Sequence, residues 1–176
     1  NANANSSHSS TSIEGNPLPL TEVKRILKNN PNYIRDTEQE VLNYNFALEY
    51  LKKLPKSKND LLNLNLVLEI QKIVMDKLIA KNNLGKIRKE PVFVNNPKIG
   101  KTIYWPPDHD DVKNLMTELI NYINQNQSKI DFLILSGIFH KQLVIIHPFV
   151  DGNGRTTRLM TKHLLANLGL NTFNLF

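Results

Sequence analysis

Apolar side chains recur every three or four positions along most of the chain, and this spacing predicts helices. In residues 37–54, one face of the predicted helix carries Val41, Tyr44, Ala47, Leu48 and Leu51. Residues 61–80 have an apolar surface wider than one stripe, so we expect this helix near the centre of the core. Similar patterns predict helices over residues 21–27, 112–124, 130–145 and 155–168.

One stretch of the chain has β character instead. Residues 91–94 and 101–105 are short and β-prone, and the turn-rich residues 95–100 lie between them, which predicts a β-hairpin. Pro106 and Pro107 end this hairpin. We find no internal repeat and no linker between two cores. The predicted fold class is therefore all-α, a helical bundle with one β-hairpin.

The N-terminal residues differ in composition from the rest. Residues 1–11 are polar and of low complexity, and we expect them to be disordered on their own. A turn signal follows, so we divide the chain into an N-terminal segment, residues 1–17, and a domain, residues 18–176. The chain ends six residues after Leu170, which leaves open whether the domain is truncated there.

Composition and charge narrow the function only slightly. The 176 residues (20.2 kDa) fit one domain with a sizeable core. A net charge of +6 favours anionic partners such as nucleic acid, a membrane surface or a nucleotide triphosphate. The absence of cysteine excludes disulfides and thiolate chemistry. No apolar run is long enough to cross a bilayer, so we expect a cytoplasmic protein without a membrane partner, and homo-oligomerisation stays open.

The most informative stretch, residues 147–158, reads His-Pro-Phe-Val-Asp-Gly-Asn-Gly-Arg-Thr-Thr-Arg and joins two predicted helices. Its second half should form the N-terminus of the second helix, where free N–H groups and a partial positive charge suit phosphate oxygens. Gly152 and Gly154 allow a positive φ and a close approach of the backbone to a ligand. The stretch therefore predicts a phosphate cradle.

Charged side chains complete this cradle. Arg155 and Arg158 lie three positions apart on one helix, and their guanidinium groups can clamp a polyphosphate. Asp151 offers a hard oxygen ligand for Mg²⁺, and His147 has a pKa near neutrality that suits a general base. This set of groups predicts displacement at phosphorus. It fits neither a Walker loop nor a Rossmann fingerprint.

The same stretch resembles the Fic-domain family, whose signature His-x-Phe-x-Asp/Glu-Gly-Asn-Gly-Arg-x-x-Arg matches here at every defined position. The resemblance covers about the last two-thirds of the chain. It implies that His147 deprotonates a target hydroxyl, that Asp151 holds magnesium and that Phe149 anchors the loop in the core. It also implies that phosphates bind to Asn153, to the Gly152 and Gly154 amides, and to Arg155 and Arg158.

The predicted hairpin, residues 91–105, looks like the flap of that family, which aligns the target protein by strand pairing. The docking residues would then be Val92, Phe93, Val94, Ile103 and Tyr104. Tyr104 and Trp105 fit two interpretations equally well, contact with adenine or target and packing of the hairpin on the core.

A second resemblance lies at the N-terminus. Residues 10–15, Ser-Thr-Ser-Ile-Glu-Gly, are similar to the inhibitory pattern Ser/Thr-x-x-x-Glu-Gly/Asn of the same family. This resemblance implies that Ser10 and Glu14 belong to an inhibitory segment in which Glu14 pairs with Arg158 and displaces the γ-phosphate. A carboxylate competes directly with phosphate for the same guanidinium donors.

Three functions stay open at this stage. The first is an autoinhibited protein adenylyltransferase that moves AMP from ATP–Mg to a Tyr, Thr or Ser hydroxyl of a target protein. The second is removal of AMP from modified proteins by the same site. The third is a catalytically silent basic helical binding module, for which the positive charge is the one argument. We do not expect a nucleic-acid partner, because no helix carries clustered arginine with base-reading side chains.

Two further features have simpler explanations. His140 lies on an apolar helix, where a packed, hydrogen-bonded histidine is more common than a catalytic or metal-bound one. The basic cluster at residues 86–89 is typical of a solvated surface.

Overall fold

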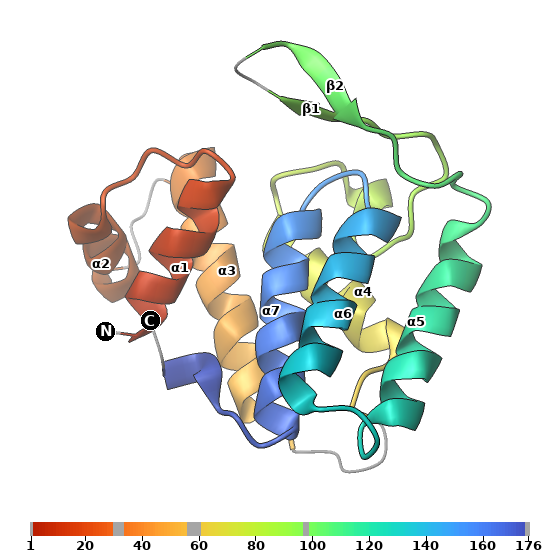
Figure 1. The fold of residues 1–176 in the computed structure, drawn as a ribbon. Helices are drawn as coiled ribbons and strands as arrows, with labels where there is room; N and C mark the ends of the chain where they lie inside the picture. Colours follow the sequence, from red (N-terminus) through yellow and green to blue (C-terminus); the bar gives the residue numbers. More distant parts are fainter. Residues whose placement is uncertain (1, 30–33, 56–60, 97–98, 175–176) are drawn as a thin grey trace.

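The computed structural model describes residues 2–29, 34–55, 61–96 and 99–174. These residues form seven α-helices and one two-stranded hairpin, which confirms the predicted all-α class (Figure 1). In chain order the elements are α1 (Ala2–Ile13), α2 (Leu20–Asn29), α3 (Asp36–Lys53), α4 (Leu64–Met75), β1 (Val94–Asn96), β2 (Lys101–Tyr104), α5 (Val112–Asn126), α6 (Phe132–Ile146) and α7 (Asn153–Asn167). Two 3₁₀ turns, Lys81–Asn83 and Thr172–Asn174, complete them.

Helix α7 lies at the centre of the bundle and contacts α3, α4 and α6. Figure 1 shows α1 and α2 beside α3 at one side of the bundle, and the hairpin above the end where α6 runs into α7. Helices α2, α3, α5, α6 and α7 begin and end within two residues of their predicted bounds. The hairpin and the α6–α7 loop, which carries the predicted chemistry, therefore lie at the same end of the molecule.

Helix α4 is a core helix, as predicted, but it is shorter than residues 61–80. Val67, Ile70 and Val74 are fully buried. The helix begins only at Leu64 because the Asn63 side chain accepts a hydrogen bond from the Leu66 N–H and acts as N-cap. It ends at Met75, before Lys77 adopts a positive φ of 62°. Apolar residues beyond these ends pack on the core without being helical, and periodicity alone could not distinguish the two states.

The expectation that residues 1–11 are disordered is wrong, because Ala2–Ile13 forms helix α1. Asparagine and serine are weak helix formers, so packing on the rest of the protein must stabilise this helix. It contacts α2, α3 and α7. The side chains that it buries are small: Ala4, Ser6, Ser7, Ser10 and Thr11.

The hairpin pairs β1 and β2 in antiparallel fashion, with Val94 opposite Tyr104. Its first strand starts later than the predicted residues 91–94, so Val92 and Phe93 precede β1. Pro91, which has no N–H to donate to a ladder, lies at the start of this stretch. The predicted turn, residues 95–100, includes residues 97–98, which lie outside the described part of the chain. Phe93 and Ile103 are more than half exposed.

The Tyr104 hydroxyl donates a hydrogen bond of 2.8 Å to the Ile145 carbonyl in the last turn of α6. Of the two interpretations of Tyr104, the structure therefore supports packing of the hairpin on the bundle. A two-stranded hairpin is marginally stable by itself, so such tethers matter for its position. Among the described residues, no helix is long and apolar enough to cross a membrane.

Candidate active site

The α6–α7 loop is held from inside. Phe149 is 1% exposed, which confirms it as the anchor of the loop in the core. The buried Asn153 side chain donates to the Phe149 carbonyl (2.9 Å) and accepts from the Phe149 N–H (3.0 Å). Both polar atoms of this amide are thus occupied by the loop backbone. Asn153 fixes the shape of the loop, and only its backbone remains for a phosphate.

His147 is the C-cap of α6 and adopts a left-handed conformation (φ 49°, ψ 61°). Its Nδ1 lies 3.3 Å from the Val144 carbonyl. Because a carbonyl only accepts hydrogen bonds, this contact places the proton on Nδ1 and leaves the lone pair on Nε2. Burial lowers the pKa of His147, and the charge of Arg88 lowers it further, against the raising effects of the Val144 contact, Asp151 and Glu14. The imidazole is therefore neutral at neutral pH and can accept a proton.

Helix α7 begins directly after Gly152, whose φ is 81°. A Cβ at Gly152 would lie 2.7 Å from the Met75 side chain, so both the backbone and the space require glycine. Gly154 is different, because it is helical and the predicted positive φ is wrong there. The missing side chain of Gly154 instead lets another group come close to the backbone. A Cβ at Gly154 would collide with the Glu14 carboxylate, which lies against the N-terminus of α7.

The structure brings both residues of the N-terminal motif onto Arg158. The Arg158 Nε donates to the Ser10 hydroxyl at 2.7 Å, and one terminal nitrogen donates to the Ser10 carbonyl at 2.9 Å. The same nitrogen forms an ion pair of 2.6 Å with Glu14. Glu14 thus places a negative charge where a helix N-terminus and a guanidinium meet, and this is where an anion is best stabilised.

Arg155 does not form a surface clamp with Arg158. Its side chain is buried, 3.4 Å from the Glu40 carboxylate and 3.5 Å from that of Asp151. Glu40 also accepts a 2.8 Å hydrogen bond from Asn16, at the end of the N-terminal segment. Within the described residues, the Arg155 Nε has no hydrogen-bond partner. Arg155 therefore contributes positive charge beneath the loop.

Asp151 carries a well-exposed carboxylate beside the loop. Its side chain is 57% exposed, and Oδ1 accepts from the Gly152 N–H at 2.5 Å. An accessible hard oxygen beside a helix N-terminus could hold a magnesium ion, which would supply positive charge near bound phosphates. The residues present are therefore compatible with the predicted metal.

The arrangement of loop, hairpin and bundle agrees with the comparisons to known proteins. A family model described as Fic/DOC family matches residues 61–165, more than half of the chain. The chain belongs to the Fic/DOC family. Two curated relatives are both named protein adenylyltransferase Fic. The one from Aedes aegypti is 30% identical over 164 residues, and the one from Culex quinquefasciatus is 31% identical over the same length.

Each of these alignments covers 91% of the chain and 31% of the relative, so the chain spans about a third of the length of its curated relatives. Among solved structures, Fic-1 from C. elegans is 27% identical, with a TM-score of 0.71 over 90% of this chain and 46% of that one. A Fic domain containing signaling protein from Bacteroides thetaiotaomicron has a TM-score of 0.82 at 22% identity. It covers 95% of this chain and 63% of its own, and supports the fold alone.

Three residues that support the Fic/DOC loop were missed by sequence reasoning: Glu40, Gln71 and Arg88. Gln71 is fully buried, donates to the Asp151 carbonyl (3.2 Å) and accepts from the Gly85 N–H (2.6 Å). A polar residue within the apolar face of α4 was a usable signal for it. The charges at positions 40 and 88 give no such signal, because surface charges are common.

Arg88 corrects the interpretation of residues 86–89 as a solvated surface. Lys86 and Lys89 are exposed, but Arg88 is 3% exposed and donates to the His147 carbonyl at 2.9 Å. His140 behaves as predicted. Its Nδ1 lies 3.1 Å from the Thr161 hydroxyl, and burial, followed by the charge of Arg158, lowers its pKa.

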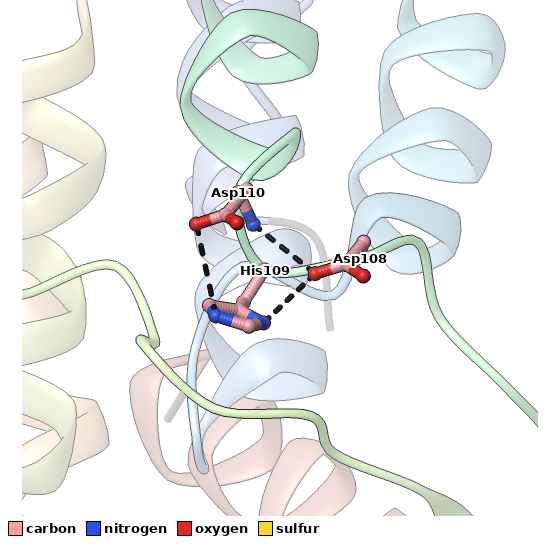
Figure 2. A group of neighbouring side chains, drawn as sticks. All are labelled: Asp108, His109 and Asp110. Carbon is pink, nitrogen blue, oxygen red and sulfur yellow. Dashed lines mark hydrogen bonds and ion pairs between the residues drawn. The ribbon is translucent and has the colours of Figure 1, made fainter.

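A separate cluster lies between the hairpin and α5 of this Fic/DOC fold. Figure 2 shows His109 between the carboxylates of Asp108 and Asp110, at 2.8 Å and 3.7 Å. These three are consecutive residues, and the two carboxylates are well exposed. The contacts drawn in Figure 2 join them to one another, so they form a local turn before α5.

Proposed function

We propose that the chain is an autoinhibited protein adenylyltransferase, which transfers AMP from ATP–Mg to a Tyr, Thr or Ser hydroxyl of a target protein. The names of the curated relatives support AMP transfer in general. One observation carries the proposal. A neutral imidazole and an exposed carboxylate, His147 and Asp151, flank a helix N-terminus that already holds an anionic group, Glu14.

In the proposed reaction, Nε2 of His147 takes the proton of the target hydroxyl as its oxygen attacks the α-phosphorus. The bond between the α-phosphorus and the oxygen bridging to the β-phosphate breaks, and pyrophosphate leaves. The amides of Gly152, Asn153 and Gly154 and the guanidinium of Arg158 bind the phosphates, and the buried positive charge of Arg155 favours them from beneath the loop. Asp151 would hold Mg²⁺, which neutralises charge on the phosphates when it is bound.

Glu14 is proposed to inhibit the reaction by occupying an anion site. Its carboxylate shares the guanidinium of Arg158 and the surface of Gly154. A γ-phosphate needs the same donors, and two anions cannot occupy them together. ATP would then bind without its productive geometry until α1 moves away.

The hairpin is proposed to dock the target. Val92, Phe93 and Val94 lie before or at the start of β1, and Ile103 lies on β2. An extended target segment can add to the edge of such a hairpin through main-chain hydrogen bonds. Tyr104 contributes differently from the prediction, because its hydroxyl is used to hold the hairpin on α6.

A labelling assay with ATP carrying its label on the α-phosphate tests this function. The wild type, Glu14→Gly and His147→Ala are compared in cell lysate. We expect little labelling by the wild type, strong labelling including self-modification by Glu14→Gly, and none by His147→Ala. Equal labelling by all three proteins would reject both the base and the inhibition.

Removal of AMP is a second candidate, favoured by the carboxylate of Glu14 at the phosphate site, where it could orient a water molecule. Incubation of an AMP-modified protein with wild type and Glu14→Gly distinguishes the two directions. Release of AMP by the wild type and not by Glu14→Gly supports removal. If neither direction is catalysed and ATP–Mg leaves the unfolding temperature unchanged, a binding module remains.

A further inference from the structure

Arg88 makes an unusual set of contacts for a residue in a basic surface cluster. Its Nε donates to the His147 carbonyl at 2.9 Å, and its terminal nitrogens donate to the carbonyls of Glu90 (3.2 Å) and Pro107 (2.5 Å). Its own N–H donates to the Pro148 carbonyl at 2.9 Å. One residue thus joins the catalytic loop to the chain on both sides of the hairpin, since residues 90 and 107 precede β1 and follow β2.

Burial of the Arg88 guanidinium costs hydration free energy, so its hydrogen bonds must compensate for this loss. The side chain is 3% exposed, and a buried cation needs compensation for its lost hydration. Its three nitrogens donate to main-chain carbonyls, two of them at the root of the hairpin. Burial lowers the pKa of Arg88, and the negative charge of the nearby Asp108 partly opposes this. The guanidinium also faces the carbonyl end of α6, where a positive charge is favoured.

The geometry of His147 explains what such a contact can do. A left-handed conformation is uncommon for a residue with a Cβ, and the surroundings must enforce it. The N–H of His147 is held by the Leu143 carbonyl at 3.1 Å. The opposite side of the residue, its carbonyl, is held by Arg88. The backbone that orients the imidazole is therefore fixed at both ends.

We propose that Arg88 is a positioning residue that clamps the backbone of the general base to the root of the target-docking hairpin. The inference rests on the proposed function, because it assigns Arg88 a role in the same transfer. Asn153 and Gln71 also hold the loop, but their contacts lie within the loop and to α4. Arg88 alone among these three connects His147 with the hairpin, so it sets the base and the target edge in one geometry.

The test uses the Glu14→Gly protein as parent and compares Arg88→Met, Arg88→Lys and the control Lys89→Met. Lys89 is the exposed neighbour, so its substitution removes the same charge without the clamp. We expect Arg88→Met to lower kcat for AMP transfer at least about tenfold, because misplaced reacting groups forfeit much of the effect of proximity. Affinity for ATP–Mg should stay within about twofold, since Arg88 does not touch the N-terminus of α7.

The pH dependence of kcat distinguishes the hydrogen bonds of Arg88 from the effect of its charge on His147. Arg88 lowers the pKa of His147, whereas Asp151, and Glu14 where present, raise it. Arg88→Met should therefore raise this pKa and move the acid limb of the rate profile to higher pH. Arg88→Lys keeps the positive charge, so the acid limb of its rate profile should stay where it is in the parent. Lysine lacks the planar guanidinium that reaches three carbonyls, so kcat should stay low.

Several outcomes would overturn the proposal. These are a folded Arg88→Met protein with unchanged kcat, full recovery of kcat by Arg88→Lys, or an equal loss in Lys89→Met. A loss of ATP affinity in parallel with kcat would show a general structural role instead. If the parent itself transfers no AMP, the proposed function fails, and hydrogen exchange decides on Arg88. Faster exchange of both residues 147–149 and the hairpin in Arg88→Met supports the clamp, and unchanged exchange rejects it.

Discussion

Helix α1 and residues 85–90 hold the loop and the start of α7 from different sides, and they do so by different means. Helix α1 buries only small side chains, and its one large apolar residue, Ile13, is 68% exposed. Its polar contacts with α7 include the hydrogen bond from Arg158 to Ser10, and the ion pair of Arg158 with Glu14 follows directly after the helix. Residues 85–90 contribute a fully buried clamp, Arg88, to the loop backbone.

The contact of α1 with α7 can therefore open locally, whereas the contact of Arg88 with the loop should persist in the folded protein. Local opening is easy where little apolar surface is buried, and charged contacts of exposed groups weaken with salt. Helix α1 fits this description, and the loop with Phe149, Asn153 and Arg88 does not. We infer that the proposed inhibition would be relieved by undocking of α1 while the loop keeps its shape.

The largest effect on stability is expected from a substitution in the tightly held loop, at Gly152. In Gly152→Ala a Cβ would meet Met75 at 2.7 Å on a backbone with φ 81°. Strain and overpacking together should lower the free energy of unfolding by about 2–5 kcal/mol and remove activity. Gly137→Ala is the control, because Gly137 occupies an exposed position of helix α6 with open space around it, and this substitution should be neutral or stabilising. Urea unfolding measures both, and equal stability of the two variants would contradict a tightly held loop.

A smaller effect is expected from a substitution that weakens the docking of α1. Ser10→Ala deletes the hydroxyl that accepts from the Arg158 Nε, and a hydrogen bond to a charged group contributes about 1.5–3 kcal/mol. The exchange of α1 amides should become faster and AMP transfer should rise, with little change in urea unfolding. Ser9→Ala, at an exposed position of the same helix, should change neither. Unaltered exchange in Ser10→Ala would show that other contacts dock α1.

Tyr104→Phe removes one tether of the hairpin, its bond to the Ile145 carbonyl. The loss of one neutral hydrogen bond corresponds to about 1 kcal/mol, so hairpin amides should exchange about fivefold faster. Tyr122→Phe, an exposed tyrosine on α5, is the matched control. Equal hairpin exchange in both variants would show that the bond from Tyr104 to Ile145 does not hold the hairpin.

The smallest effect concerns pH. Burial lowers the pKa of His140, His147 and His163. Below the ordinary histidine value of about 6.5, the unfolded chain therefore binds more protons than the folded one. The free energy of unfolding should rise with pH up to this value and then level off with respect to these groups. Urea unfolding between pH 5 and 8 tests the sign, and higher stability at the acid end would contradict it.

Much of the fold was predictable from local patterns. The helices other than α1, the hairpin and the burial of Phe149 follow from periodicity and from the motif at residues 147–158. Helix α1 was not predictable, because its sequence has weak helix propensity and its stability comes from packing. Arg88 and Glu40 act through partners 59 and 115 positions away, respectively (147 − 88 and 155 − 40). Contacts between residues so far apart in the sequence produce no periodic pattern from which they could be predicted.

The central proposal is that His147 and the N-terminus of α7 direct attack at the α-phosphorus of ATP. The direct test measures pyrophosphate released and AMP bound to protein by Glu14→Gly with ATP–Mg. We predict equal amounts of the two products, and neither product when His147→Ala is added. Release of inorganic phosphate from the γ-position, or AMP transfer that persists without His147, would contradict the account.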